Sequence, residues 1–181
     1  AWPDYDQQLR DCIDIAYDQY GIRTEITIFG GAGESFPTYA GRQAHCQRVL
    51  NNLAGREHKI QFIEVANEGW QTGFEGEQGR LDLRSLGQYL ADRTSIPIAL
   101  TAMCTSEATQ SSLVNLYSGS AADITTEHFE RYLGGPEGHW FPVRDPWRAV
   151  DVPGLPPVSS NEPVGPGSSV ASEDDPIHIA S

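Results

Sequence analysis

Two hydrophobic periods alternate along most of this chain. Segments with an apolar side chain every three or four residues predict amphipathic helices, and short runs rich in β-branched residues predict strands. The predicted helices cover residues 4–19, 39–54, 81–93 and 109–120. The predicted strands cover residues 21–29, 59–68, 96–104, 122–129 and 156–162. This order indicates an α/β fold whose parallel strands are joined by helical crossovers.

The spacing of the strands narrows the fold class. Successive strands begin about 33 residues apart, close to the roughly 31 residues per unit of an eight-stranded β/α barrel. An open doubly wound sheet would space its units similarly. With 181 residues, the chain is long enough for one domain with a core, so we expect residues 1–181 to form a single domain. Residues 134–146 predict a long loop, and residues 147–151 and 175–181 predict two short helices.

Net charge and cysteine spacing argue against several kinds of partner and against disulfide or zinc sites. The net charge is −13, so we expect neither a nucleic acid nor a membrane as partner, and a neutral substrate fits better. Cys12, Cys46 and Cys104 show no CxxC pattern or clustering, so we expect no disulfide framework and no zinc site. No apolar run approaches 18 residues, and the first residues lack a signal-peptide pattern.

The strand over residues 59–68 runs directly into Asn67, Glu68, Gly69 and Trp70. In parallel α/β folds, functional residues lie at the carboxyl ends of strands. Strand alternation would place Glu68 on the same face as Glu64. A partly desolvated carboxyl group near another carboxylate has a raised pKa, which suits a general acid. A simple turn after the strand is the alternative, and we expect Trp70 to be an exposed aromatic that stacks on a sugar ring or fills a cleft.

A second carboxylate follows a similar strand. Glu162 comes after Asn161 at the end of the strand over residues 156–162, about three units of roughly 31 residues beyond Glu68. Carboxylates three strands apart would face one another across an eight-stranded barrel. Glycosidases use such a pair, about 5–5.5 Å apart for retention and farther apart for inversion. A surface turn before Pro163 is the alternative.

The segment IEVANEGW, residues 63–70, resembles the fourth-strand motif of retaining (β/α)8-barrel glycoside hydrolases, the clan that includes cellulases, mannanases and β-galactosidases. The resemblance implies that Glu68 is the acid/base, that Asn67 binds the sugar, and that Glu162 is the nucleophile. It also implies a partial TIM barrel of about strands 3 to 7, so we expect a fragment of a longer enzyme that lacks strands 1, 2 and 8. Neither a metal nor an organic cofactor is implied.

Two further aromatic or histidine positions are candidates for substrate binding. His128 lies near the end of the strand over residues 122–129 and matches a position where that clan often has an active-site His or Tyr. Trp140, beside His139, lies in the predicted long loop and is a candidate sugar platform. A hydrogen-bonded structural histidine and a loop anchored by its own tryptophan are the alternatives.

The glycines at positions 30, 31 and 33 suggest a nucleotide site only weakly. Phe36 stands where the dinucleotide fingerprint needs a glycine, and the Gly-Lys-Ser/Thr ending of a P-loop is absent. We expect instead that this loop passes close to a ligand or another loop. The sequence thus predicts a retaining glycoside hydrolase acting on an oligo- or polysaccharide. A non-catalytic carbohydrate-binding barrel and a nucleotide-dependent α/β enzyme remain as alternatives.

Overall fold

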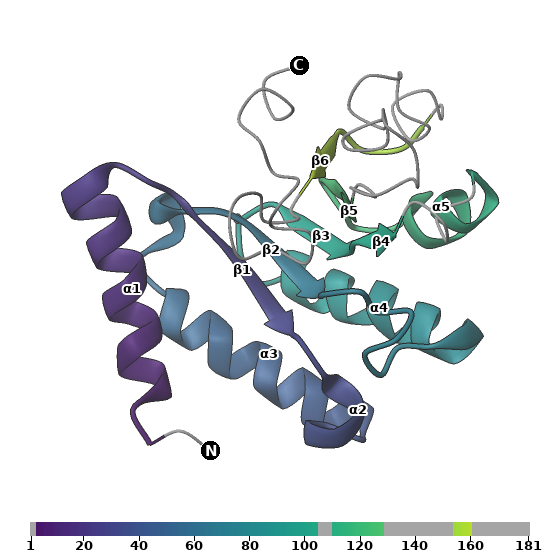
Figure 1. Ribbon diagram of the computed structural model, residues 1–181, viewed down its shortest axis with the longest axis horizontal. Coiled ribbons are helices and arrows are strands. Elements are labelled where there is room, and N and C mark those ends of the chain that lie inside the picture. Colours follow the sequence, from purple (N-terminus) through teal and green to yellow (C-terminus); the bar gives the residue numbers. More distant parts are fainter. Residues whose placement is uncertain (1–2, 105–109, 129–153, 161–181) are drawn as a thin grey trace, which may run out of the picture.

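A computed structural model of the protein describes residues 3–104, 110–128 and 154–160 (Figure 1). Its helices are α1 (Tyr5–Tyr20), α2 (Ala32–Ser35), α3 (Tyr39–Leu53), α4 (Gly76–Ala91) and α5 (Gln110–Tyr117), with a 3₁₀ turn η1 (Glu57–Lys59). Its strands are β1 (Thr24–Phe29), β2 (Ile60–Ala66), β3 (Ile98–Thr101), β4 (Met103–Cys104), β5 (Thr125–His128) and β6 (Val158–Ser160). The predicted α/β alternation is confirmed in these residues. The two short helices predicted at residues 147–151 and 175–181 lie outside them.

All the described strand pairs are parallel. One sheet has the order β1-β2-β3, and the other has the order β4-β5-β6. Only Ala102 separates β3 from β4, and the amides of Asp123 and Ile124, just before β5, donate to the carbonyl of Ile98 in β3 at 2.7 and 3.2 Å. The strand that the sequence predicts over residues 96–104 is therefore interrupted at one residue, and β5 lies beside both parts.

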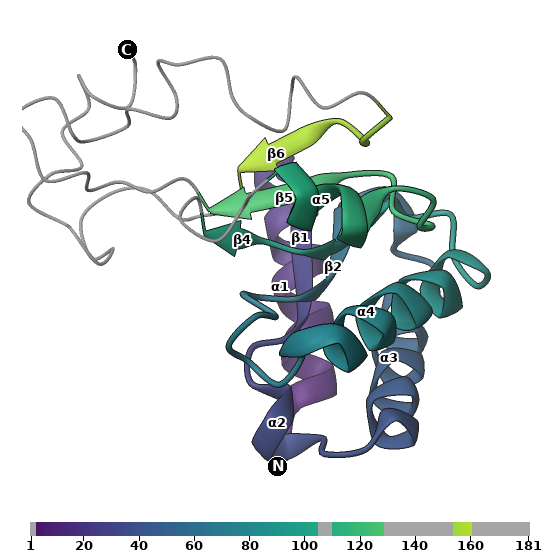
Figure 2. The same cartoon turned by 90° about the vertical axis from the view of Figure 1, so that its right-hand side faces the viewer.

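Helices α3 and α4 lie together on one side of the β1-β2-β3 sheet (Figures 1 and 2). On this side, strand residues such as Val65 and Leu100 join one buried cluster with Leu53 of α3 and Leu86 of α4. Burying one such side chain contributes about 1.5–3 kcal/mol. The helices therefore cover the face of the sheet to which Val65 and Leu100 project.

The opposite face of the sheet is more polar. Strand register places Thr27 of β1, Glu64 of β2 and Ala99 of β3 in one row across it. Glu64 is fully buried, whereas Thr27 is exposed. This face carries the polar groups that the candidate site uses.

Helix α4 begins five residues before its predicted start at residue 81. Glycines at 76 and 79 lower helix propensity, which hid the first turn. A Cβ at Gly79 would lie 2.0 Å from the backbone carbonyl carbon of Phe74, so only glycine lets the helix pass the preceding loop. Close packing against that loop, and not propensity, sets where α4 begins.

The described residues also bear on three further features: membrane-spanning helices, metal-binding groups and free cysteines. No described helix is both long and apolar enough to cross a bilayer. Within the same residues, no group of three or more His, Cys, Asp or Glu side chains could hold a metal ion. Cys12 is an exposed free thiol and Cys46 a buried one, and burial raises the pKa of Cys46 to about 12.

Candidate functional site

The candidate site is built on the loop of residues 67–75, which joins β2 to α4. The amide of Asn67 donates to the carbonyl of Phe29 at 2.8 Å, extending the pairing with β1 one residue past Ala66. Glu68 then has φ of 44°, and among the described residues it is the one non-glycine with positive φ. This conformation costs an L-residue about 1–2 kcal/mol. Strand alternation therefore ends before Glu68, and a turn, not the strand face, positions this side chain.

Hydrogen bonds hold both the side chain and the carbonyl of Glu68. The side-chain amide of Gln71 donates to Oε2 of Glu68 at 2.6 Å, and the backbone amide of Gln71 donates to the Glu68 carbonyl at 2.9 Å. The hydroxyl of Thr72 donates to the carbonyl of Asn67 at 2.7 Å. The loop thus presents an oriented carboxyl group at the carboxyl end of a parallel strand.

Gly69, the next residue, is buried against β3 and α4. Its amide donates to Oγ1 of Thr101 at 2.7 Å. A Cβ at this position would lie 3.1 Å from that oxygen and 3.2 Å from Cδ1 of Leu83. Glycine therefore fits closely here, and a larger residue would make the Thr101 and Leu83 side chains shift by a few tenths of an ångström.

The glycine-rich loop after β1 lies directly against the loop of residues 67–75. The amides of Ala32 and Gly33 donate to the carbonyl of Thr72 at 2.7 and 3.4 Å. Gly73 has φ of 105°, and a Cβ there would lie 2.2 Å from the amide nitrogen of Gly33. The expected close approach of the glycine loop to another loop is confirmed. A phosphate would have to compete for these two amides, which counts against a nucleotide site.

Arg42 in the first turn of α3 fastens these two loops together, and it is only 7% exposed. It donates to the carbonyl of Gly73 at 2.7 Å and to that of Phe36 at 2.9 Å. Its guanidinium group also pairs with Asp82 of α4 at 3.3 Å and lies 4.3 Å from the ring centroid of Phe74. Our sequence analysis missed Arg42, and its position in the helix that follows a glycine loop was the one available signal.

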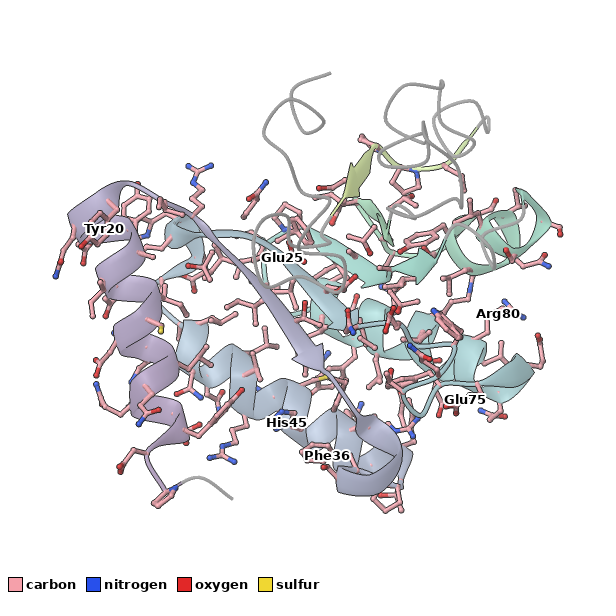
Figure 3. The ribbon with its side chains drawn as sticks, in the orientation of Figure 1. Tyr20, Glu25, Phe36, His45, Glu75 and Arg80 are labelled. Carbon is pink, nitrogen blue, oxygen red and sulfur yellow. The ribbon has the colours of Figure 1, made fainter. Side chains whose placement is uncertain are left out.

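Phe36 and His45 complete this support. Their rings stack with centroids 4.5 Å apart, and Figure 3 shows the two residues next to each other near α2. Burial, and then the nearby Arg48, lower the pKa of His45, so it is neutral near pH 7. An uncharged ring is what packs well here, because Phe29 also contacts His45 with centroids 5.6 Å apart.

Trp70 is partly buried, so the expectation of an exposed aromatic is wrong. It lines a pocket of about 260 Å³ together with Phe74, Arg80 and Leu116. Figure 3 labels Arg80, which lies in the second turn of α4. The indole nitrogen of Trp70 is buried and finds no hydrogen-bond acceptor among the described residues. Of the two roles expected for Trp70, stacking on a sugar ring and filling a cleft, its partly buried position favours the second.

The buried Glu64 of β2 takes part in a hydrogen-bond network that the sequence did not predict. Oε2 of Glu64 accepts from the hydroxyl of Thr27 on β1 at 2.9 Å, and Oε1 accepts from the hydroxyl of Thr126 on β5 at 2.6 Å. Between β2 and β5, the register partner of Glu64 is Ala99. The small side chain of Ala99 lets Glu64 reach across β3, linking the first sheet to the second.

The remaining predicted site residues are only partly located. His128 is the last residue of β5, with its backbone in register with Cys104. Strand β6 is confirmed and ends at Ser160, two residues before Glu162. Glu162, His139 and Trp140 lie outside the described residues. The structure therefore brings Asn67, Glu68 and Trp70 into one loop and leaves the pairing of Glu68 with Glu162 untested.

Comparisons with family models, curated proteins and solved structures found no match to this chain. Conclusions about function therefore depend on the geometry of the loop and on the chemistry of its residues.

Proposed function

We propose that this protein is a retaining glycoside hydrolase that cleaves O-glycosidic bonds of an oligo- or polysaccharide, with Glu68 as acid/base and Glu162 as nucleophile. We further propose that its strands correspond to the third to seventh strands of a (β/α)8 barrel. Asn67, Trp70, His128 and Trp140 are the proposed contacts to the sugar. The reaction needs neither a metal nor a cofactor.

One observation carries the proposal: β2 and β6 belong to one series of parallel strands. Parallel strands end at the same edge, so the segments that bear the two carboxylates both leave from that edge. With β3 and β4 counted as one position, β6 lies three positions from β2. Three positions is the separation that brings carboxyl groups toward each other across an eight-stranded barrel.

A hydrogen bond across β3 supports a curved sheet, as the proposed barrel requires. Neighbouring strands lie about 4.8 Å apart, so β2 and β5 are separated by roughly twice that distance in a flat sheet. The 2.6 Å hydrogen bond between Glu64 and Thr126 is favoured when the strands curve toward the face that bears these side chains. That face is opposite α3 and α4, as the interior of a barrel is opposite its helices.

The proposed chemistry uses each carboxyl group in a separate role. Protonated Glu68 gives its proton to the glycosidic oxygen as the bond from that oxygen to the anomeric carbon breaks, while the Glu162 carboxylate forms an ester with that carbon. A water molecule then attacks the anomeric carbon, Glu68 takes its proton, and the ester bond to Glu162 breaks. The hydrogen bond from Gln71 restricts rotation of the Glu68 carboxyl group, which favours transfer in one direction.

The test uses Glu68→Gln and Glu162→Gln in the natural polypeptide that contains residues 1–181, assayed on nitrophenyl glycosides and on polysaccharides. Glu68→Gln should lower turnover by about 10²- to 10⁴-fold on substrates with poor leaving groups. The loss should be smaller on dinitrophenyl glycosides, because their leaving group departs without a proton. Glu162→Gln should lower turnover on both kinds of substrate.

Glu57→Gln is the matched control, because Glu57 is an exposed glutamate in η1, at the end of β2 opposite to Glu68, and should keep wild-type turnover. Near-normal activity in Glu68→Gln would remove that residue from the mechanism. A protein that binds oligosaccharides in calorimetry but shows no turnover, even before mutation, would instead be the carbohydrate-binding alternative.

A further inference from the structure

The backbone at Glu68 needs an explanation that the proposed reaction does not supply. Glu68 has φ of 44°, which L-residues rarely adopt. Such conformations persist only where the surroundings hold them. The question is which contact keeps this residue in the left-handed region.

The peptide bond between Glu68 and Gly69 is held from both sides. The Gly69 amide donates to Oγ1 of Thr101 at 2.7 Å, in a buried position. The Glu68 carbonyl, on the other side of the same peptide plane, accepts from the Gln71 amide at 2.9 Å and from the Thr72 hydroxyl at 3.2 Å. The peptide is planar, so these contacts fix its orientation and with it ψ of Glu68. The preceding peptide is held as well, because its Asn67 carbonyl accepts from the Thr72 hydroxyl at 2.7 Å, and the two fixed peptides together set φ of Glu68.

Thr101 is itself firmly placed. It is the last residue of β3, in register with Ala66, and is 2% exposed. The Tyr117 hydroxyl donates to the Thr101 carbonyl at 2.7 Å and accepts from the Thr101 amide at 3.2 Å. Oγ1 of Thr101 donates to the carbonyl of Ala102 at 3.3 Å, which leaves its lone pairs directed to other donors such as the Gly69 amide.

Tyr117 extends this support into the core. Its ring is 1% exposed, and its hydroxyl also accepts from the Thr126 amide at 3.3 Å. Burial raises the pKa of Tyr117 to about 12, so its hydroxyl keeps its proton and donates at any ordinary pH. Thr101 is therefore a fixed acceptor anchored to both β5 and α5.

We propose that Thr101 is the positioning residue for Glu68: its hydroxyl holds the Glu68–Gly69 peptide so that Glu68 stays left-handed and its carboxyl group keeps one direction at the edge of the sheet. The catalytic meaning of this placement rests on the proposed function. The backbone role of Thr101 does not, and it is measured separately.

The first experiment compares Thr101→Val, which keeps the shape and removes the hydroxyl, with Thr101→Ser, which keeps the hydroxyl. In Thr101→Val, the hydrogen-exchange rate of the Gly69 amide should rise roughly tenfold relative to the rates of the β2 amides. In Thr101→Ser, this rate should stay at the wild-type value. In the wild-type protein, NMR couplings and carbon shifts should report a left-handed Glu68. A Glu68 with negative φ in solution would overturn the proposal without any variant, even if Thr101→Val failed to fold.

The second experiment measures kcat, KM and the pH profile of kcat on whichever nitrophenyl glycoside or polysaccharide the protein cleaves. Thr101→Val should lower kcat by about a hundredfold, with KM nearly unchanged, because a misplaced acid/base affects the chemical step. Thr101→Ser should restore kcat and the wild-type pH profile. Wild-type kcat and Gly69 protection in Thr101→Val would overturn the proposal.

The two proposals fail in different ways. If Glu68→Gln is active while Thr101→Val alters the backbone of Glu68, the proposed function fails and the backbone role of Thr101 stands. If Glu68→Gln is inactive while Thr101→Val keeps wild-type kcat, the proposed function stands and positioning by Thr101 fails.

Discussion

Glu64 illustrates how much a single buried residue depends on its partners. A carboxyl group without exposure to water is costly unless hydrogen bonds replace its hydration. Here two threonine hydroxyls, from Thr27 and Thr126, supply them. The two donors differ in environment, because Thr126 is fully buried and Thr27 is exposed. Water can therefore replace the Thr27 hydroxyl far more easily than that of Thr126.

This difference predicts unequal effects of two equivalent substitutions. Thr126→Val should lower the free energy of unfolding by about 1–3 kcal/mol, because the Glu64 carboxyl group loses a buried donor. Thr27→Val should cost less than about 1 kcal/mol, because solvent reaches that oxygen. Urea unfolding of both variants measures the difference. Equal losses would mean that the difference in solvent exposure does not decide how much each hydrogen bond contributes.

At the scale of elements, the loop of residues 67–75 gains its shape from neighbours far away in the sequence. The glycine loop after β1 contacts it through Gly33 and Gly73, and Arg42 of α3 binds its carbonyl at Gly73. Together with Thr101 of β3, which accepts from the Gly69 amide, these make three elements that hold the loop carrying Glu68. A chain segment that is irregular in itself becomes rigid because each contact excludes an alternative conformation.

Gly73→Ala tests this packing against Gly55→Ala. Both glycines have positive φ, 105° and 79°, but a Cβ at Gly55 meets nothing within 4 Å, whereas one at Gly73 meets the Gly33 backbone. We expect Gly55→Ala to cost about 1 kcal/mol through backbone strain alone. Gly73→Ala should cost at least about 3 kcal/mol, from strain and overlap together. Similar unfolding midpoints in urea would contradict the packing of the two loops.

For the whole molecule, ion pairs connect α1 to the rest of the protein. Asp14 of α1 accepts from Arg56 at 2.8 Å and from Lys59 at 2.9 Å, and Asp6 of α1 pairs with Arg48 of α3 at 2.9 Å. The Asp6 pair is exposed and the Asp14 pairs are still partly exposed, so each contributes little at neutral pH. They do make the attachment of α1 sensitive to acid, because the carboxylates must stay charged.

The pH dependence of stability should show the contribution of Asp14. Hydrogen bonds from Arg56, and then from Lys59, lower its pKa from 3.8 to about 2. Because the folded-state pKa lies below the unfolded value, the stabilisation is complete above about pH 4 and is lost as pH falls toward about 2. Asp14→Asn should therefore reduce stability at pH 6 and have less effect at pH 3.

Urea midpoints at the two pH values check this prediction. Asp11→Asn is the control, because Asp11 lies on the same helix and accepts from the uncharged side-chain amide of Gln7 at 2.7 Å. A constant effect of Asp14→Asn between pH 6 and pH 3 would show that its ion pairs do not link α1 to folding.

The sequence by itself determined the kinds of element and their order. Apolar spacing predicted α1, α3 and α5 nearly to their ends, and the run of β-branched residues predicted β1 and β2, because these patterns reflect local geometry and burial on one face. It also identified the Asn67-Glu68 segment at a strand end. Strand alternation, extended to Glu68, was wrong because a hydrogen bond from Gly69 to a residue 32 positions later turns the chain there.

Only the tertiary structure decided how that segment is held. Thr101, Arg42 and Gly73 act through contacts between residues distant in the sequence, and no periodicity along the chain encodes such contacts. The same holds for the early start of α4 beside Phe74 and for Glu64 reaching Thr126 across β3. Local patterns determine which elements form, whereas close packing and buried hydrogen bonds determine where a carboxyl group such as that of Glu68 is placed.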